Sequence, residues 1–157
     1  MTQAQTEKNL LIVYHSQSGN TASLANAVLA GAALEPAVQT RVKLAYEADV
    51  SDLSWADGVL FGTPENLGYM SGALKDFFDR TYYPAQPLQL CLPYALFISA
   101  GNDGSGAVRE IDRIMLGYPM KKVAEPVVVK GEVSANALAQ CKDMGQAMAA
   151  ALSMGLY

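Results

Sequence analysis

Long apolar segments are missing from this sequence. In its 157 residues no apolar run reaches the roughly 18 residues that are needed to cross a membrane. Residues 1–9 are polar and lack the apolar centre of a signal peptide, so they predict a flexible N-terminal tail. We therefore expect no membrane association, and we expect a cytoplasmic location.

Metal-binding residues are also scarce. Cys91 and Cys141 lie far apart, in apolar surroundings and outside any CxxC spacing, and His15 is the single histidine. Cysteine and histidine at such spacings predict no metal site. Both thiols are expected to be buried and structural, in a protein of a reducing compartment.

Positive charge is in deficit too. Lys and Arg total 11 against 15 Asp and Glu, and the resulting net charge of −4 does not favour a nucleic-acid partner. With 51% hydrophobic and 17% charged residues, the composition is that of a compact globular protein. The chain has no internal repeats and no low-complexity linkers, so residues 10–157 are expected to form one domain.

What the chain does contain is an alternation of strand and helix patterns. Apolar runs predict buried parallel strands, and apolar residues at three- and four-residue steps predict helices between them. The expected strands are residues 10–14, 38–44, 59–61, 94–98 and 127–129, and the helical stripes begin at Leu24, Leu74, Val108 and Leu138. The alternating apolar and polar residues of 38–44 indicate an exposed edge strand. The sequence therefore predicts an α/β fold with a doubly wound, five-stranded parallel sheet in the order 2-1-3-4-5 and helices on both faces.

The first loop of this expected sheet, residues 16–21, predicts an anion site. It leads from an apolar strand into a helix, and the first turn of a helix leaves unpaired N–H groups at its positive end. Hydroxyl groups add donors, glycine allows close approach, and the absence of Lys and Arg means that neutral donors would hold a phosphate. The candidate residues are Ser16, Gln17, Ser18, Gly19, Asn20 and Thr21. The alternative is an ordinary capped turn.

Two common phosphate loops do not fit residues 16–21. The Walker pattern requires a Gly-Lys-Ser/Thr ending and the dinucleotide fingerprint requires three glycines, whereas this loop has one glycine and no lysine. The FMN-phosphate signature of the flavodoxin family is matched at Ile12, Val13, Tyr14, Ser16, Gly19, Thr21, Ala25 and Val28. The stretch therefore resembles a flavodoxin-type FMN site. This resemblance implies a flavodoxin-like fold and one bound FMN, with its phosphate in the first loop.

The second loop, residues 63–71, has glycines and a proline for tight turns. Its apolar side chains can cover one face of a flat ring, while backbone N–H groups reach the polar edge of that ring. Residues 56–80 resemble the segment shared by flavodoxin-fold NAD(P)H:FMN and quinone reductases. That resemblance implies flavin contacts, with Gly68 at the place where the backbone approaches ring nitrogen N5. The implied contacts are Thr63, Pro64, Glu65, Asn66, Leu67, Gly68 and Tyr69.

The third loop, residues 99–106, is small and polar, and it resembles the family's third flavin loop, which borders the pyrimidine end of the ring. The implied contacts are Ser99, Ala100, Gly101, Asn102, Asp103 and Gly104. The aromatic residue that many flavodoxins place here is missing, which leaves one flavin face open to a second planar molecule. Glu65 and Asp103 would lower the flavin's potential if they lay close to the ring, and would have no such effect as solvated turn residues.

Three functions remain open at this point. An FMN-dependent NAD(P)H oxidoreductase of the quinone reductase type, with NADH or NADPH as donor and a quinone or similar acceptor, fits the open third loop. A flavodoxin-type one-electron carrier that docks a redox partner protein is the runner-up, although such carriers have a denser acidic face. A non-catalytic flavin-binding sensor is the third. No catalytic residue is assigned, since a flavin carries its own chemistry, and homo-oligomerisation is left open.

Overall fold

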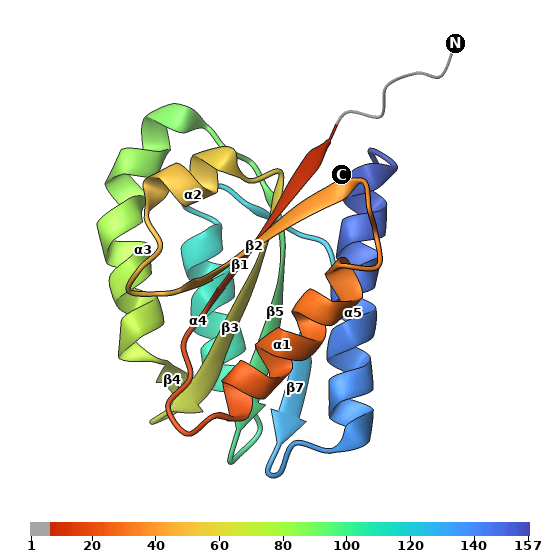
Figure 1. Ribbon diagram of the computed structural model, residues 1–157. Helices are drawn as coiled ribbons and strands as arrows, with labels where there is room; N and C mark the ends of the chain where they lie inside the picture. The colour runs from red at the N-terminus through yellow and green to blue at the C-terminus, as the bar shows by residue number, and fades with distance from the viewer. Residues whose placement is uncertain (1–6) are drawn as a thin grey trace.

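The computed structural model describes residues 7–157, in which one parallel sheet carries helices on both faces (Figure 1). The strands are β1 (Lys8–Tyr14), β2 (Val38–Leu44), β3 (Gly58–Asn66), β4 (Tyr69–Met70), β5 (Pro93–Ala100), β6 (Lys121–Lys122) and β7 (Val127–Lys130). The helices are α1 (Asn20–Ala32), α2 (Val50–Trp55), α3 (Gly72–Ala85), α4 (Ser105–Met115) and α5 (Ala135–Ser153), with a short 3-10 turn, η1, at Gln86–Leu88. The α/β fold with a parallel sheet that the sequence predicts is confirmed.

The sheet differs from the prediction by its additional strands. The neighbours β2-β1-β3-β5 are parallel, and both β6 and β7 pair with β5 at the far edge, β6 near its start and β7 along its second half. The five expected strands lie in the expected order 2-1-3-4-5, as β2-β1-β3-β5-β7, but the expected number of five strands is wrong for the described residues. These residues form seven strands in the order β2-β1-β3-β5-β6, with β7 also on β5 and β4 antiparallel to β3.

Two local backbone features explain the additional strands. The edge pairs with β5 in two registers, with Lys121 opposite Pro93 and Val127 opposite Phe97, so it has two more residues than β5 between these pairs and is divided into β6 and β7. Leu67 and Gly68 have φ values of 53° and 73°, the left-handed pair that folds a chain back in a two-residue hairpin. The additional strands β4 and β6 contain two residues each, too few to produce a sequence pattern.

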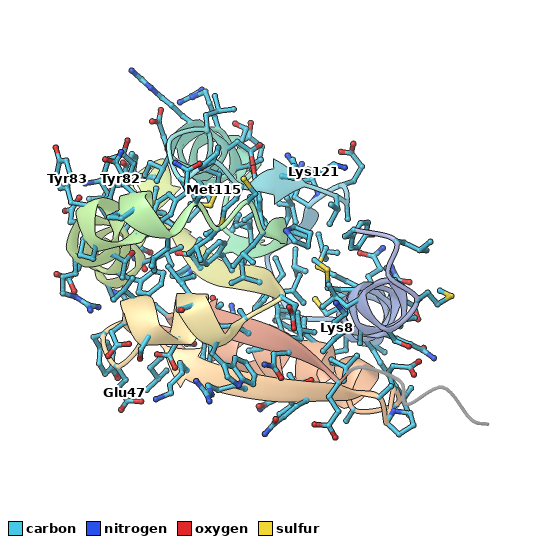
Figure 2. All side chains as sticks on the ribbon, turned by 90° about the horizontal axis from the view of Figure 1, so that it is seen from above. Lys8, Glu47, Tyr82, Tyr83, Met115 and Lys121 are labelled. Carbon is cyan, nitrogen blue, oxygen red and sulfur yellow. The ribbon has the colours of Figure 1, made fainter. Side chains whose placement is uncertain are left out.

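Both faces of the central strands are buried, which is why these strands read as continuous apolar runs. Leu11, Phe61 and their neighbours pack beneath α2, α3 and α4, whereas Leu10, Leu60 and others pack beneath α1 and α5. Figure 2 shows side chains on both sides of the sheet, with Tyr82 and Met115 on the side of α3 and α4. The core is therefore two layers of side chains separated by one sheet.

Strand β1 begins at Lys8, before the expected start at residue 10, because polar bonds hold its first residues. The Asn9 N–H donates to Asp57 Oδ2 at 2.8 Å, and the Asp57 N–H donates back to the Asn9 carbonyl at 2.8 Å. The Asn9 amide also donates to the Trp55 carbonyl at 2.9 Å. Residues 1–6, the remainder of the expected tail apart from Glu7, lie outside the described residues.

The four helices with apolar stripes are confirmed as α1, α3, α4 and α5, whereas α2 was not predicted. Its six residues are too few for a periodic stripe, and a capping box between Asp49 and Asp52 starts the helix instead. Within residues 7–157 no helix is long and apolar enough to cross a membrane.

The backbones of α1 and α5 touch at two glycines. A Cβ added to Gly31 of α1 would lie 1.9 Å from the Lys142 carbonyl oxygen, and a Cβ added to Gly145 of α5 would lie 2.0 Å from the Val28 carbonyl oxygen. These distances leave no room for any side chain at either position. The close contact holds α1, whose N-terminus follows the first loop, against α5.

The expectation that both cysteines are buried is wrong for one of them. Cys141 lies in α5 and is buried, but Cys91 is exposed in the segment between η1 and β5, where its φ is 46°. The apolar neighbours of Cys91 in the sequence gave no sign that the backbone turns it outward. Burial raises the pKa of the Cys141 thiol to about 11.

A thiol reagent at about pH 8 is expected to label the native protein at Cys91 alone. The thiolate is the reactive form, and Cys141 is both inaccessible and held protonated by its raised pKa. Intact-mass spectrometry measures the number of labels, and unfolded protein, which should take two, is the control. Equal labelling rates for both cysteines in the native protein would contradict the burial of Cys141.

Candidate functional site

The three predicted loops meet beyond the carboxyl ends of β1, β3 and β5, at the lower end of the sheet in Figure 1. A cleft of about 590 Å³ opens between them. Residues of all three loops line it, together with a fourth loop, residues 131–133, which follows β7. Such a crevice at the carboxyl ends of parallel strands is where open α/β sheets bind their ligands.

The first loop takes its shape from one of its own hydroxyls. Ser16 Oγ accepts the N–H of Gly19 at 3.2 Å and the N–H of Ala22 at 3.1 Å. Gly19 has a φ of 101° and no atom within 4 Å of the place of a Cβ, so its backbone is open to a ligand. Ser18 and Asn20 are exposed and line the cleft. These two side chains and the start of α1 are the donors that an anion can reach.

Two side-chain bonds join the first loop to its neighbours. Thr21 is 1% exposed, and its hydroxyl lies 2.8 Å from the Ser99 hydroxyl of the third loop. The Asn66 amide of the second loop donates to Gln17 Oε1 at 2.9 Å. Thr21 therefore has an internal partner, and its predicted contact with a phosphate stays a prediction.

The second loop begins with an internally bonded threonine. Thr63 Oγ1 accepts the Ser71 N–H at 2.9 Å and donates to the Pro64 carbonyl at 2.8 Å, which fixes both ends of the loop. Pro64, Glu65 and Asn66 line the cleft. The loop is thus a hairpin, β3 to β4, and not a plain connection between a strand and a helix.

The tip of this hairpin is exposed. Leu67 and Gly68 form the turn, and the Leu67 side chain is fully exposed. Tyr69 lines a separate hollow between α3 and α4. The predicted contacts of these three residues with a flavin would therefore come from the backbone or from the rim of the cleft.

Glu65 bonds to the start of a helix. Its two carboxylate oxygens accept the N–H of Gly104 at 3.2 Å and the N–H of Gly106 at 3.1 Å, at the N-terminus of α4. The side chain is half-buried. Because backbone N–H groups engage both oxygens, Glu65 is not the solvated turn residue of the one alternative. It lines the cleft, and its closeness to a flavin stays a prediction.

The third loop contributes residues 99–101 to the cleft, while Asn102 and Asp103 are exposed beside it. Asp103 Oδ1 accepts the Ser105 N–H at 3.0 Å and the Ser105 hydroxyl at 2.8 Å, and these two bonds lower the pKa of the Asp103 carboxyl. Gly104 has a φ of 71° and precedes the first residue of α4. The Asp103 carboxylate therefore stabilises the turn that leads into α4.

A fourth loop, which the sequence pattern does not predict as part of the site, completes the cleft. Gly131, Glu132 and Val133 line the cleft, and Ser134 caps α5 by accepting the Ala137 N–H at 3.1 Å. The signal was present, since a glycine and a capping serine directly follow the expected strand 127–129, as in the other loops.

The charged residues that line the described cleft are Glu65 and Glu132, and none of its lining residues is Lys or Arg. An anionic group would therefore depend on N–H and hydroxyl donors and on the positive end of α1. Among residues 7–157, no group of three His, Cys, Asp or Glu could hold a metal ion.

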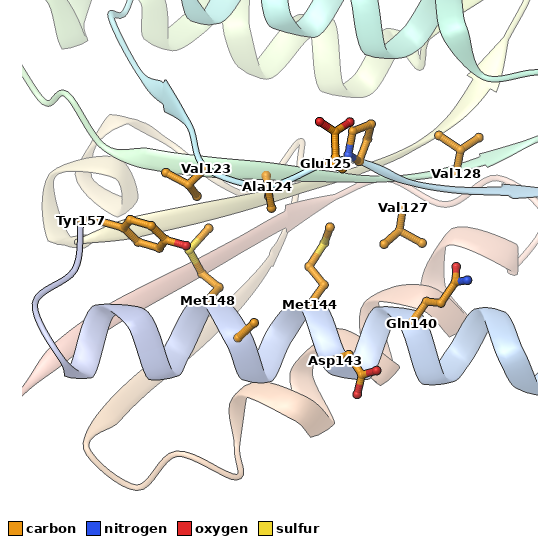
Figure 3. Close-up of a pocket in the computed structure, with 13 residues that line it drawn as sticks. Val123, Ala124, Glu125, Val127, Val128, Gln140, Asp143, Met144, Met148 and Tyr157 are labelled. Carbon is orange, nitrogen blue, oxygen red and sulfur yellow. The ribbon is translucent and has the colours of Figure 1, made fainter.

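A larger hollow, of about 630 Å³, lies between the divided sheet edge and α5 (Figure 3). Met144 and Met148 reach from α5 toward the edge residues Val123 and Val127 in this view. None of the residues that line it belongs to the four loops. The wall of this hollow is mainly apolar and no helix begins there. The cleft between the loops is therefore the better candidate site.

Known families and proteins share sequence and fold with this chain. The family model of the NADPH-dependent FMN reductases matches residues 45–137. A flavodoxin from Aquifex aeolicus is 39% identical over 45% of this chain and 38% of that protein, and an NAD(P)H dehydrogenase (quinone) from Acidithiobacillus ferrooxidans is 32% identical over 46% of each. A solved archaeal flavodoxin has a TM-score of 0.78 at 26% identity, covering 90% of this chain and 96% of that one.

The chain belongs to the NADPH-dependent FMN reductase family, whose model matches more than half of it, and it is a flavodoxin-like, FMN-binding protein. The matches to the two curated relatives span less than half of those relatives' own length.

The residues of the cleft fit FMN. Neutral donors and an open glycine backbone lie at the start of α1, where a terminal phosphate can bind. The backbone of a hairpin lies opposite, where a flat ring can meet peptide groups.

Proposed function

We propose that the protein holds FMN in the cleft and acts as an NAD(P)H-dependent oxidoreductase that passes electrons to a quinone or similar acceptor. The observation that carries this proposal is the composition of the cleft wall. No aromatic side chain lines the described cleft, so none would cover the exposed ring face. A nicotinamide must stack on that face at about 3–3.5 Å to transfer a hydride.

Each wall of the cleft has a separate role in this proposal. Ser18, Asn20 and the N–H groups at the start of α1 bind the phosphate. The hairpin of residues 63–70 orients the ring through its backbone, and residues 99–101 border the pyrimidine end. Bound FMN supplies the hydride chemistry itself, so the protein needs no acid or base of its own.

NADH or NADPH is expected to bleach the bound flavin directly under anaerobic conditions, and a quinone should restore the oxidised spectrum. The measurement is an absorbance spectrum of the FMN-loaded protein during stepwise reduction. Asn102→Trp, which places an aromatic ring beside the open wall, should slow the bleaching at least about tenfold while FMN stays bound. Ser54→Trp adds the same ring at an exposed position of α2 and is the control.

The same experiment decides against the proposal if neither nucleotide reduces the flavin. A stable one-electron signal with dithionite would then favour a flavodoxin-type carrier for a redox partner protein. That second candidate is supported by the similarity to an archaeal flavodoxin over 96% of that chain. The cytoplasmic location, the homo-oligomeric state and the identity of donor and acceptor stay predictions to be tested on the purified protein.

A further inference from the structure

The hairpin of the second loop and the start of α4 are joined by one carboxylate. Glu65 Oε1 accepts the Gly104 N–H at 3.2 Å and Glu65 Oε2 accepts the Gly106 N–H at 3.1 Å. The N-terminal N–H groups of a helix have no partner within the helix. Glu65 therefore supplies from a distant strand what a capping side chain usually supplies locally.

A backbone contact supports the same junction. A Cβ added to Gly106 would lie 1.9 Å from the Gly68 carbonyl oxygen, so α4 begins directly against the hairpin turn. The same Cβ would lie 3.4 Å from Glu65 Oε2. The glycine allows the approach, and the carboxylate beside it holds the two segments at that separation.

The hairpin tip needs such external support. Leu67 has a φ of 53°, in the left-handed region that is strained for a leucine. Its side chain is fully exposed and makes no packing contact that could offset this strain. Only two residue pairs, Glu65 with Met70 and Asn66 with Tyr69, join β3 to β4. The tip is therefore held by its contact with α4 as well as by the side-chain bonds described above.

We propose that Glu65 is a positioning residue that locks the hairpin to α4 before any flavin binds, so that the ring-facing wall of the cleft is preorganised. The lock is a property of the protein chain alone, and its effect on flavin affinity rests on the proposed function. Because the hairpin meets the ring and not the phosphate, the lock acts equally on FMN and on riboflavin. This distinguishes it from the first loop, which acts on the phosphate.

Glu65→Ala tests the lock in two ways. Hydrogen exchange at the Gly104 and Gly106 amides of the flavin-free protein should accelerate at least about tenfold, because both N–H groups lose their acceptors. The dissociation constants of FMN and riboflavin should both rise about tenfold or more, and by the same factor. Glu65→Gln keeps one acceptor oxygen, so its amide exchange rates and its flavin dissociation constants should lie between those of the wild type and of Glu65→Ala. This second variant keeps the test valid if the alanine variant folds poorly.

Asp49→Ala is the matched control. It removes a helix-capping carboxylate of the same charge from α2, away from the residues that line the cleft, and should change neither flavin constant. The proposal is overturned if Glu65→Ala exchanges Gly104 and Gly106 at the wild-type rate, or if it weakens FMN alone. A wild-type protein that bound no flavin would refute the proposed function, while the exchange of the two amides would still decide whether the lock exists.

Discussion

Replacing Gly145 by alanine is expected to lower the free energy of unfolding by about 2–3 kcal/mol, although alanine favours a helix by about 1 kcal/mol over glycine. The new Cβ would lie 2.0 Å from the Val28 carbonyl oxygen of α1. A backbone oxygen cannot rotate away as a side chain can, so α1 and α5 must separate. Separation would also open the apolar layer that these two helices form with the sheet.

Urea denaturation followed by circular dichroism measures this loss. Gly72→Ala is the matched control, because Gly72 is the first residue of α3 and no atom lies within 4 Å of the place of its Cβ. The control should be neutral or slightly more stable. If the Gly145→Ala protein were as stable as this control, α1 and α5 would be able to separate without lowering the free energy of unfolding, and the prediction would be wrong.

The double substitution Ser18→Ala with Asn20→Ala is expected to weaken FMN about a hundredfold or more while leaving riboflavin unchanged. Each side chain lines the cleft at the start of α1, and a hydrogen bond to a charged phosphate contributes about 1.5–3 kcal/mol. Titration of flavin-free protein with each flavin, followed by fluorescence, gives the two dissociation constants.

Ser23→Ala is the control for this pair. Ser23 lies in the same helix turn, but its hydroxyl donates to the Gly19 carbonyl at 3.1 Å and it does not line the cleft. It should leave both flavins bound as in the unaltered protein. If the double variant weakened riboflavin as much as FMN, the phosphate would have to bind elsewhere.

The main elements could be predicted because their burial leaves a pattern. The central strands are covered on both faces and so appear as apolar runs, and α1, α3, α4 and α5 each bury one stripe. The divided edge could not be predicted in the same way. The division depends on whether the backbone of residues 123–126 pairs with β5. Backbone hydrogen bonds decide this pairing, and the pattern of apolar residues does not reveal them.

The loops of the candidate site could be placed because they follow predicted strands. Their internal bonds could not, since Thr21 and Ser99 are joined by a contact between residues 78 positions apart. Glu65 is a similar case: as a glutamate in a turn it suggested a flavin contact or a solvated side chain, and only the fold brings it to Gly104. Cys91 was misjudged because a positive φ turns it out of an apolar segment.

The bond between Thr21 and Ser99 also joins parts of the cleft that are made at different times during synthesis. During synthesis the first loop leaves the ribosome long before β5, and the contact that closes the cleft has a high sequence separation. A nascent chain that stops before Ser99 has the first two loops but no third wall. The lining of the cleft is complete only once the chain has been made through residue 133, because residues 131–133 form its fourth wall.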